Sequence, residues 1–144
     1  MINRNFIERK CKLIGEELKR LEPLSKKPFD EVAKSGVEMA LVERYLERLI
    51  TRAIDINQHI IAELGDGSEK VRGYEDTFFV LAKFGVYDEN FGKQLAPSAG
   101  LRNRLVHEYN DMDEKIVFQS VGKALEQYPR YCQAILDFAE KHAS

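Results

Sequence analysis

Residues 50–61 read ITRAIDINQHII, and this stretch decides the fold. Its apolar residues recur at helical spacing, but they cover more than one face of the helix. A helix of this kind is buried best when two neighbouring surfaces pack against it. We therefore expect it at the centre of the domain. Its apolar residues are Ile50, Ala53, Ile54, Ile56, Ile60 and Ile61.

The N-terminal segment has the simpler pattern of an amphipathic helix. Apolar residues follow one another at spacings of four and three from residue 7 to residue 21, which places them on one helix face. Pro23 and Pro28 are expected to end this helix and to mark the following turn. A second helical pattern runs over residues 29–64, and Ser35-Gly36 is a weak point that either kinks or splits it. The first seam consists of Ile7, Cys11, Ile14, Leu18 and Leu21.

The C-terminal half continues with helices that are separated by turn and capping residues. Gly65–Ser68 predicts a turn, a helix follows over residues 74–84 with Gly85 as its C-cap, and Asp88 is placed to cap the next one. Pro97 either kinks that helix or restarts it as a first-turn residue. A long helix ends the chain, and no strand alternation, glycine-rich phosphate loop or internal repeat is evident. The prediction is an all-α, up-and-down bundle of four to five helices, forming one domain over residues 1–144.

The composition limits the possible functions. With 22 basic and 24 acidic residues the net charge is −2, which argues against broad non-specific nucleic-acid binding, so any RNA contact must be local. No apolar run has the length of a membrane span, and the charged N-terminus is unlike a signal peptide. The only cysteines, Cys11 and Cys132, sit in helical patterns and are expected to be buried, reduced thiols of a cytoplasmic protein. No histidine or cysteine cluster predicts a metal site.

Residues 102–109 read RNRLVHEY and carry the chemistry. The imidazole of His107 can give or take a proton near neutral pH, and the guanidinium of Arg102 is a planar donor suited to phosphate. Asn103 could orient His107 or hold a phosphate oxygen. These groups suit RNA transesterification without a metal ion, whereas a bare Arg-x4-His spacing is also compatible with surface residues of an ordinary amphipathic helix.

Helix geometry does not place both groups at one phosphate. Arg102 and His107 are five residues apart, which is about 140° around a helix and about 7.5 Å along it. Either Arg102 reaches round the helix, or a second copy of the chain completes the site. The second alternative predicts a homodimer with the two helices facing each other across a two-fold axis.

Asp55 and His59 are a second polar pair, four residues apart in the central helix. They could belong to the functional cleft or bind a partner. A structural hydrogen bond between the two side chains, at the edge of the core, is the interpretation we favour. Asp55 taken alone is expected to be an ordinary exposed carboxylate.

Two segments resemble a known family. Arg102-Asn103-x-Leu105-Val106-His107-x-Tyr109 is similar to the Arg-x4-His-x-Tyr signature of HEPN-domain toxins of the HepT type, and Ala53–Ile61 is similar to that family's Ile-Asp-Ile-x-x-His-Ile segment. Together with weaker matches the resemblance spans most of residues 30–115.

The resemblance implies a specific function. It implies a dimeric, metal-independent ribonuclease without cofactors, acting as the toxin of a toxin–antitoxin pair, with Arg102 and His107 as catalytic residues. It also implies a minimal nucleotidyltransferase as antitoxin, which transfers AMP to Tyr109. The competing hypothesis is a non-catalytic helical partner that binds a nucleotidyltransferase and helps to hold its nucleotide or substrate.

Overall fold

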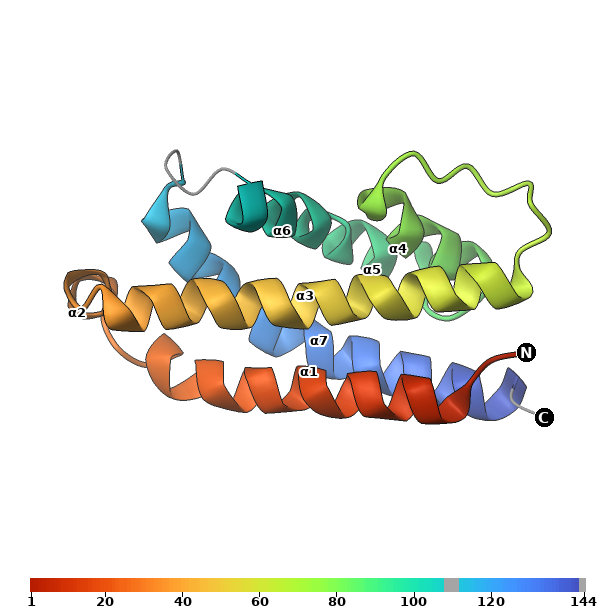
Figure 1. The fold of residues 1–144 in the computed structure, drawn as a ribbon, viewed down its shortest axis with the longest axis horizontal. Coiled ribbons are helices and arrows are strands. Elements are labelled where there is room, and N and C mark those ends of the chain that lie inside the picture. The colour runs from red at the N-terminus through yellow and green to blue at the C-terminus, as the bar shows by residue number, and fades with distance from the viewer. Residues whose placement is uncertain (108–111, 143–144) are drawn as a thin grey trace.

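A computed structural model of the chain describes residues 1–107 and 112–142 (Figure 1). This part of the chain contains seven helices and no strand. Five of the helices have ten residues or more and form the predicted all-α bundle, whereas α2 and α5 are short. The helices are α1 (Arg4–Ser25), α2 (Phe29–Lys34), α3 (Val37–Leu64), α4 (Tyr74–Lys83), α5 (Glu89–Leu95), α6 (Pro97–His107) and α7 (Glu114–His142).

Helix α3 is the central element, as the sequence predicts. In Figure 1 it crosses the length of the molecule, with α1 and α7 on one side and α4, α5 and α6 on the other, and it contacts α1, α4, α6 and α7. Five of the six apolar residues named above are buried, and Ile61 is partly buried against the core. Each fully buried isoleucine stabilises the fold by about 1.5–3 kcal/mol, so this one helix organises the packing of both layers.

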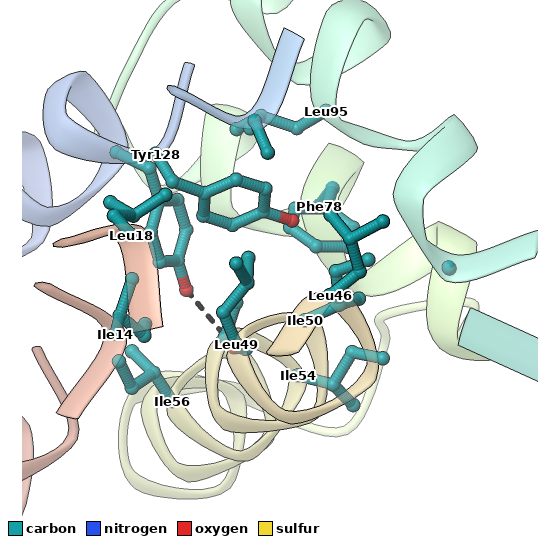
Figure 2. Close-up of a cluster of buried hydrophobic side chains, with 14 of the residues drawn as sticks. Ile14, Leu18, Leu46, Leu49, Ile50, Ile54, Ile56, Phe78, Leu95 and Tyr128 are labelled. Atoms are coloured by element: carbon teal, nitrogen blue, oxygen red, sulfur yellow. Dashed lines mark hydrogen bonds between the residues drawn. The ribbon is translucent and has the colours of Figure 1, made fainter. Parts of the chain in front are cut away.

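The core is a continuous cluster of mainly aliphatic and aromatic side chains, to which all seven described helices contribute. Figure 2 shows Ile14 and Leu18 of α1, Phe78 of α4 and Leu95 of α5 gathered around α3, with Tyr128 of α7 among them. Because these contributions come from segments far apart in the sequence, the long helices cannot separate without exposing apolar surface.

Prolines and glycines divide the chain largely as predicted, with one correction. Pro23 does not end the first helix, which continues to Ser25 because the next residue, Leu24, is buried in the core. The weak point at Ser35-Gly36 splits the second segment into α2 and α3, with Gly36 at a φ of 23°. Pro97 restarts the chain as the first residue of α6, which settles the choice left open by the sequence.

The predicted N-cap of α5 is present, whereas the C-cap of α4 is Phe84, one residue before the predicted Gly85. Gly85 follows the end of α4 with a φ of 89°, a conformation that glycine adopts without steric cost. Asp88 caps α5, because its Oδ1 accepts a hydrogen bond of 2.7 Å from the backbone N–H of Phe91. The short α5 is therefore bounded on its N-terminal side by two local signals that were readable in the sequence.

The two cysteines lie on facing helices. Cys11 of α1 is buried, Cys132 of α7 is partly buried, and both are free thiols. A hydrogen bond with Cys11, followed by burial, raises the pKa of the Cys132 thiol. In the described part of the chain, no helix combines the length and the apolar character needed to cross a membrane.

Candidate functional site

Helix α6 presents the predicted site residues on its outward surface. Ala99, Leu101 and Leu105 are buried and attach the helix to the bundle. Arg102 is partly buried between this attached side and the solvent, whereas His107 is exposed at the end of the helix. Buried apolar residues that pack α6 on the bundle therefore alternate along the sequence with polar residues that reach the solvent.

Three contacts hold Arg102. Its Nε donates a hydrogen bond of 3.1 Å to Oγ1 of Thr51 on α3. Its guanidinium carbon lies 5.5 Å from the ring centroid of Tyr74 on α4, within the range of a cation–π interaction. A terminal nitrogen also donates to Oδ1 of Asn103 at 3.3 Å. Two neighbouring helices thus fix the guanidinium, while its remaining N–H groups can bind an anion.

Tyr74 is itself held by a buried chain of hydrogen bonds. Tyr131 of α7 donates to Oδ1 of Asn57 at 2.5 Å, and its hydroxyl lies 3.0 Å from the carbonyl of Ala53. The Asn57 amide donates to Thr77 at 3.0 Å, and the Thr77 hydroxyl donates to the carbonyl of Tyr74 at 2.5 Å. This network, which joins α7, α3 and α4, defines the start of α4 and hence the position of the ring beside Arg102.

Asn103 is linked to Arg102. The sequence allowed it to orient His107 or to hold a phosphate oxygen, and the described residues give its side chain a hydrogen bond with Arg102 instead of one with His107. Its Oδ1 accepts this bond, which leaves the amide N–H groups of the exposed side chain as possible donors. Asn103 can therefore support the guanidinium and still donate to a phosphate.

His107 is the last described residue of α6, and it is not held in the same way. No hydrogen bond or ion pair joins its ring to residues 1–107 or 112–142. Since α6 is helical from Arg102 to His107, the two residues keep the predicted offset of about 140° and about 7.5 Å. Tyr109, the predicted AMP acceptor, lies outside the described residues.

The predicted hydrogen bond between Asp55 and His59 is not formed. Asp55 accepts a 2.9 Å hydrogen bond from Nζ of Lys10 on α1, and its side chain is 38% exposed. Nε2 of His59 accepts from the backbone N–H of Asn3 at 3.0 Å, and its ring lies 4.9 Å from that of Phe6. The prediction was wrong in its pairing, because α1 lies beside α3 and offers each group a better partner; these two residues fasten the start of α1.

Sequence reasoning did not identify Thr51, Tyr74 or Asn57 as supports of the site. Asn57 carried a readable signal, because a polar residue in the middle of an apolar central helix requires a buried partner. Thr51 and Tyr74 carried none, since their role depends on how α6 and α4 pack on α3. No group of three or more His, Cys, Asp or Glu side chains in residues 1–107 and 112–142 could hold a metal ion.

Known proteins resemble the chain over most of its length. A protein of Aphanizomenon flos-aquae named tRNA nuclease HepT is 39% identical over 130 residues, which cover 90% of this chain and 87% of the relative. A putative RNase of Archaeoglobus fulgidus is 31% identical over 121 residues, covering 84% and 88% of the two chains.

A solved structure of a HEPN toxin is also similar to this chain. The tri-AMPylated HEPN toxin of Shewanella oneidensis in complex with the MNT antitoxin has a TM-score of 0.79 and 25% identity, over 93% of this chain and 98% of the toxin chain. The family described as ribonuclease HepT-like matches residues 14–135, which include α6 and all the supports of Arg102. The chain therefore belongs to the HepT-like ribonuclease family.

Proposed function

We propose that this protein is a metal-independent endoribonuclease and the toxin of a toxin–antitoxin pair with a nucleotidyltransferase. The observation that carries the proposal is the arrangement on α6, where a guanidinium held by α3 and α4 and an exposed imidazole occur together in a chain of the HepT-like ribonuclease family. The first group binds phosphate charge and the second transfers protons, and RNA cleavage needs both functions.

The proposed reaction is an attack within the RNA strand. The ribose 2′-hydroxyl attacks the adjacent phosphorus, the O2′–P bond forms, and the P–O5′ bond breaks. His107 takes the proton from the 2′-hydroxyl or delivers one to the departing 5′-oxygen. Arg102, assisted by Asn103, stabilises the negative charge that grows on the phosphorane oxygens. The products are a 2′,3′-cyclic phosphate and a 5′-hydroxyl, and DNA, which lacks the 2′-hydroxyl, is not a substrate.

We propose further that two chains form the site. Because of their offset in one helix, the side chains of Arg102 and His107 point in different directions. Arg102 is hydrogen-bonded to Thr51 and does not reach round α6 toward His107. A two-fold axis beside α6 would bring His107 of a second copy to the Arg102 of the first. A homodimer with composite sites is therefore the assembly that we propose.

Neutralisation would occur by modification of the same site. Tyr109 follows His107 by two residues in the sequence, and the matched Shewanella toxin is described as tri-AMPylated and in complex with the MNT antitoxin. Transfer of AMP to the Tyr109 hydroxyl would place a negative phosphodiester beside Arg102 and His107. It would exclude the substrate phosphate by occupancy and by like-charge repulsion. Accordingly, Tyr109→Phe should cleave RNA but escape the antitoxin.

The test is cleavage of a defined RNA in EDTA by the wild-type protein and by His107→Ala, with a DNA of the same sequence as control. A tRNA is the first substrate to use, because the Aphanizomenon relative is named a tRNA nuclease. RNA-only cleavage that leaves cyclic phosphate ends and is lost in the variant is the expected result. If the folded protein cleaves no RNA but binds a nucleotidyltransferase, the non-catalytic partner hypothesis takes its place.

A further inference from the structure

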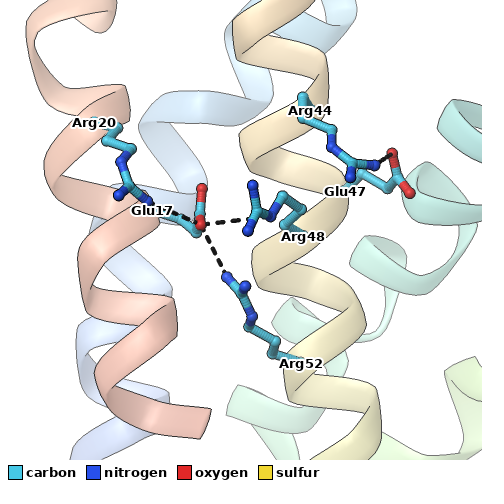
Figure 3. Close-up of polar contacts among 6 residues, drawn as sticks. All are labelled: Glu17, Arg20, Arg44, Glu47, Arg48 and Arg52. Atoms are coloured by element: carbon cyan, nitrogen blue, oxygen red, sulfur yellow. Dashed lines mark hydrogen bonds and ion pairs between the residues drawn. The ribbon is translucent and has the colours of Figure 1, made fainter. Parts of the chain in front are cut away.

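Helix α3 carries a row of three arginines on its outward face. Arg44, Arg48 and Arg52 are spaced by four residues, so each lies about 6 Å beyond the previous one and about 40° further around the helix. Figure 3 shows Arg48 and Arg52 directed toward Glu17 of α1, and Arg44 directed the other way, toward Glu47. The exposed fractions of the three side chains are 60%, 41% and 14%, so the row runs from open solvent toward the packed centre of α3.

A buried carboxylate holds the inner part of this row. Glu17 of α1 is 1% exposed, and its Oε1 lies 2.9 Å from a nitrogen of Arg52 and 3.6 Å from Nε of Arg48. Arg20, one turn further along α1, reaches the same oxygen at 3.1 Å. Three guanidinium groups therefore share one carboxylate, which leaves two positive charges in excess on a protein whose net charge is −2.

The geometry differs from that of a cluster that serves only to neutralise Glu17. Guanidinium–carboxylate pairs are frequently bidentate, with two parallel hydrogen bonds that use both carboxylate oxygens. Here all three arginines approach Oε1, while the buried Oε2 has no hydrogen-bond partner in the part of the chain that the structure describes. Most N–H donors of Arg48, which is 41% exposed, consequently remain available to an anion in solution.

The outer part of the row lies on the same side of α3 as the proposed active site. Thr51, which accepts the hydrogen bond from Arg102, comes seven residues after Arg44 and three after Arg48, which is about 20° and about 60° away from them around the helix. Arg52 adjoins Thr51 in the sequence but is directed toward Glu17 of α1. At the other end, Arg44 pairs with Glu47 at 3.4 Å, an exposed ion pair of a kind that contributes little and can be exchanged for another anion. An RNA strand with one phosphate bound at Arg102 would thus place neighbouring phosphates near further guanidinium groups of α3.

We propose that Arg44, Arg48 and Arg52, braced by Glu17, form a track that binds the sugar–phosphate backbone of the RNA strand leading to Arg102. The proposal rests on the proposed function, since it assigns the substrate contacts of the same site. A line of cations at regular spacing matches a polyanion, and contacts to phosphates position a nucleic acid without reading its sequence. The track also explains how a mildly acidic protein concentrates RNA at one place on its surface.

Binding of a fluorescein-labelled single-stranded RNA tests the track. The measurement uses His107→Ala protein, so that the RNA is not cut, and it records Kd by anisotropy over a series of salt concentrations. Arg44→Gln and Arg48→Gln are each expected to weaken binding about three- to tenfold and to reduce the slope of log K against log salt by about 0.7, the value for one phosphate contact in a single strand. Arg48→Lys keeps the charge and should keep most of the slope.

Arg4→Gln is the matched control. Arg4 is exposed and forms an ion pair with Glu8 at the far end of α1, so its loss removes the same charge away from the track. Thermal melting of each variant establishes that the bundle is intact. An unchanged Kd and slope in both Arg44→Gln and Arg48→Gln would overturn the proposal, as would unchanged RNA binding with loss of nucleotidyltransferase binding, which would make the row a protein interface.

The failure of the track and the failure of the proposed function are distinguishable. If the track variants bind RNA normally while the wild-type protein cleaves it, the track is wrong and the function stands. If RNA binding depends on Arg44 and Arg48 but no RNA is cleaved in EDTA, the track stands and the metal-independent reaction is wrong.

Discussion

The two reactive groups of α6 differ in how the fold treats them. Arg102 touches Thr51 of α3 and Tyr74 of α4, and the second of these is fixed by buried hydrogen bonds that reach α7. His107, five residues further on, is exposed and has no hydrogen bond or ion pair with the rest of the described chain. Helix α6 therefore carries a guanidinium that neighbouring helices hold in place, on Arg102, and an exposed imidazole, on His107.

This difference separates the two tasks of the proposed reaction. Stabilisation of phosphorane charge is effective when the donor is already in place, because no reorganisation is needed as the charge develops. Proton transfer needs only that the imidazole meets the reacting oxygen at the correct distance. We propose that a single chain supplies the first condition and that the second is met when a partner chain or the substrate arrives.

The largest expected effect comes from removing either side chain of the pair formed by Arg102 and His107. His107→Ala should lower the cleavage rate by about 10²–10⁴-fold, the range for general acid–base catalysis, and Arg102→Ala by about 10²–10³-fold, the range for removal of a donor that stabilises developing charge. Arg102 is only partly buried and His107 is exposed, so the helical circular dichroism signal should remain. A loss of that signal in either variant would mean that the residue supports the fold and would contradict the assignment.

Mixing the two inactive variants sharpens the comparison. If Arg102 of one chain works with His107 of the other, half of the dimers formed by co-refolding are mixed and each contains one intact site, so about a quarter of the activity should return. If both groups of a site come from the same chain, no activity returns. Sedimentation under the assay conditions reports whether the proteins are dimeric.

The buried network provides the second largest effect. Tyr131→Phe keeps the ring in the core but leaves the buried Oδ1 of Asn57 without its donor, which should lower the free energy of unfolding by about 1–3 kcal/mol. Urea denaturation measures this loss. We expect the remaining folded protein to bind phosphate less well at Arg102. An unchanged stability would show that a water replaces the hydroxyl.

The direct supports of Arg102 should have a smaller effect. Thr51→Val removes the hydrogen-bond acceptor at nearly constant volume, and Tyr74→Leu removes the aromatic face. Tyr74→Leu should reduce kcat/KM about three- to fivefold, since an exposed cation–π contact contributes about 0.5–1 kcal/mol, and Thr51→Val should reduce it about tenfold, since a hydrogen bond to a charged group contributes about 1.5 kcal/mol or more. The pH profile should not move, because neither residue touches His107. A shifted profile would mean that the two ends of α6 are coupled.

Part of this arrangement could be predicted from the sequence. The central helix follows from its apolar residues on several faces, and the restart at Pro97 was one of two alternatives that helix rules allow. These features depend on local rules of periodicity and capping. The motif residues were identified through a resemblance, whose family the comparisons show.

The rest depends on contacts between distant segments. Asp55 and His59 were expected to pair because they share a helix face, yet Lys10 and Asn3 are their partners in the folded chain. Pro23 was expected to end a helix that packing instead continues. The i, i+4, i+8 spacing of arginines in α3 was visible in the sequence, but its meaning required Glu17, which comes from another helix.

The smallest expected effect concerns the end of the bundle where the chain passes from α6 to α7. Burial, followed by the charge of Glu114 at the start of α7, raises the pKa of Glu43 on α3. A carboxyl group whose folded pKa is raised stabilises the fold below its unfolded pKa and loses that contribution as the pH rises through the folded pKa. At pH 7 the ionised Glu43 is therefore a small cost to the folded state.

Glu43→Gln should remove this cost and raise the Tm at pH 7 by about 1 °C, since solvent screens a partly exposed carboxylate. The gain should vanish below about pH 4, where the wild-type carboxyl is protonated as well. Melting curves from pH 3.5 to 8 test the sign, and Glu114→Gln should give part of the same gain by removing the repelling charge. A gain that is constant with pH would instead reflect packing of the amide. A gain that follows the pH as described would show that burial and the charge of Glu114 disfavour the ionised Glu43 in the folded state.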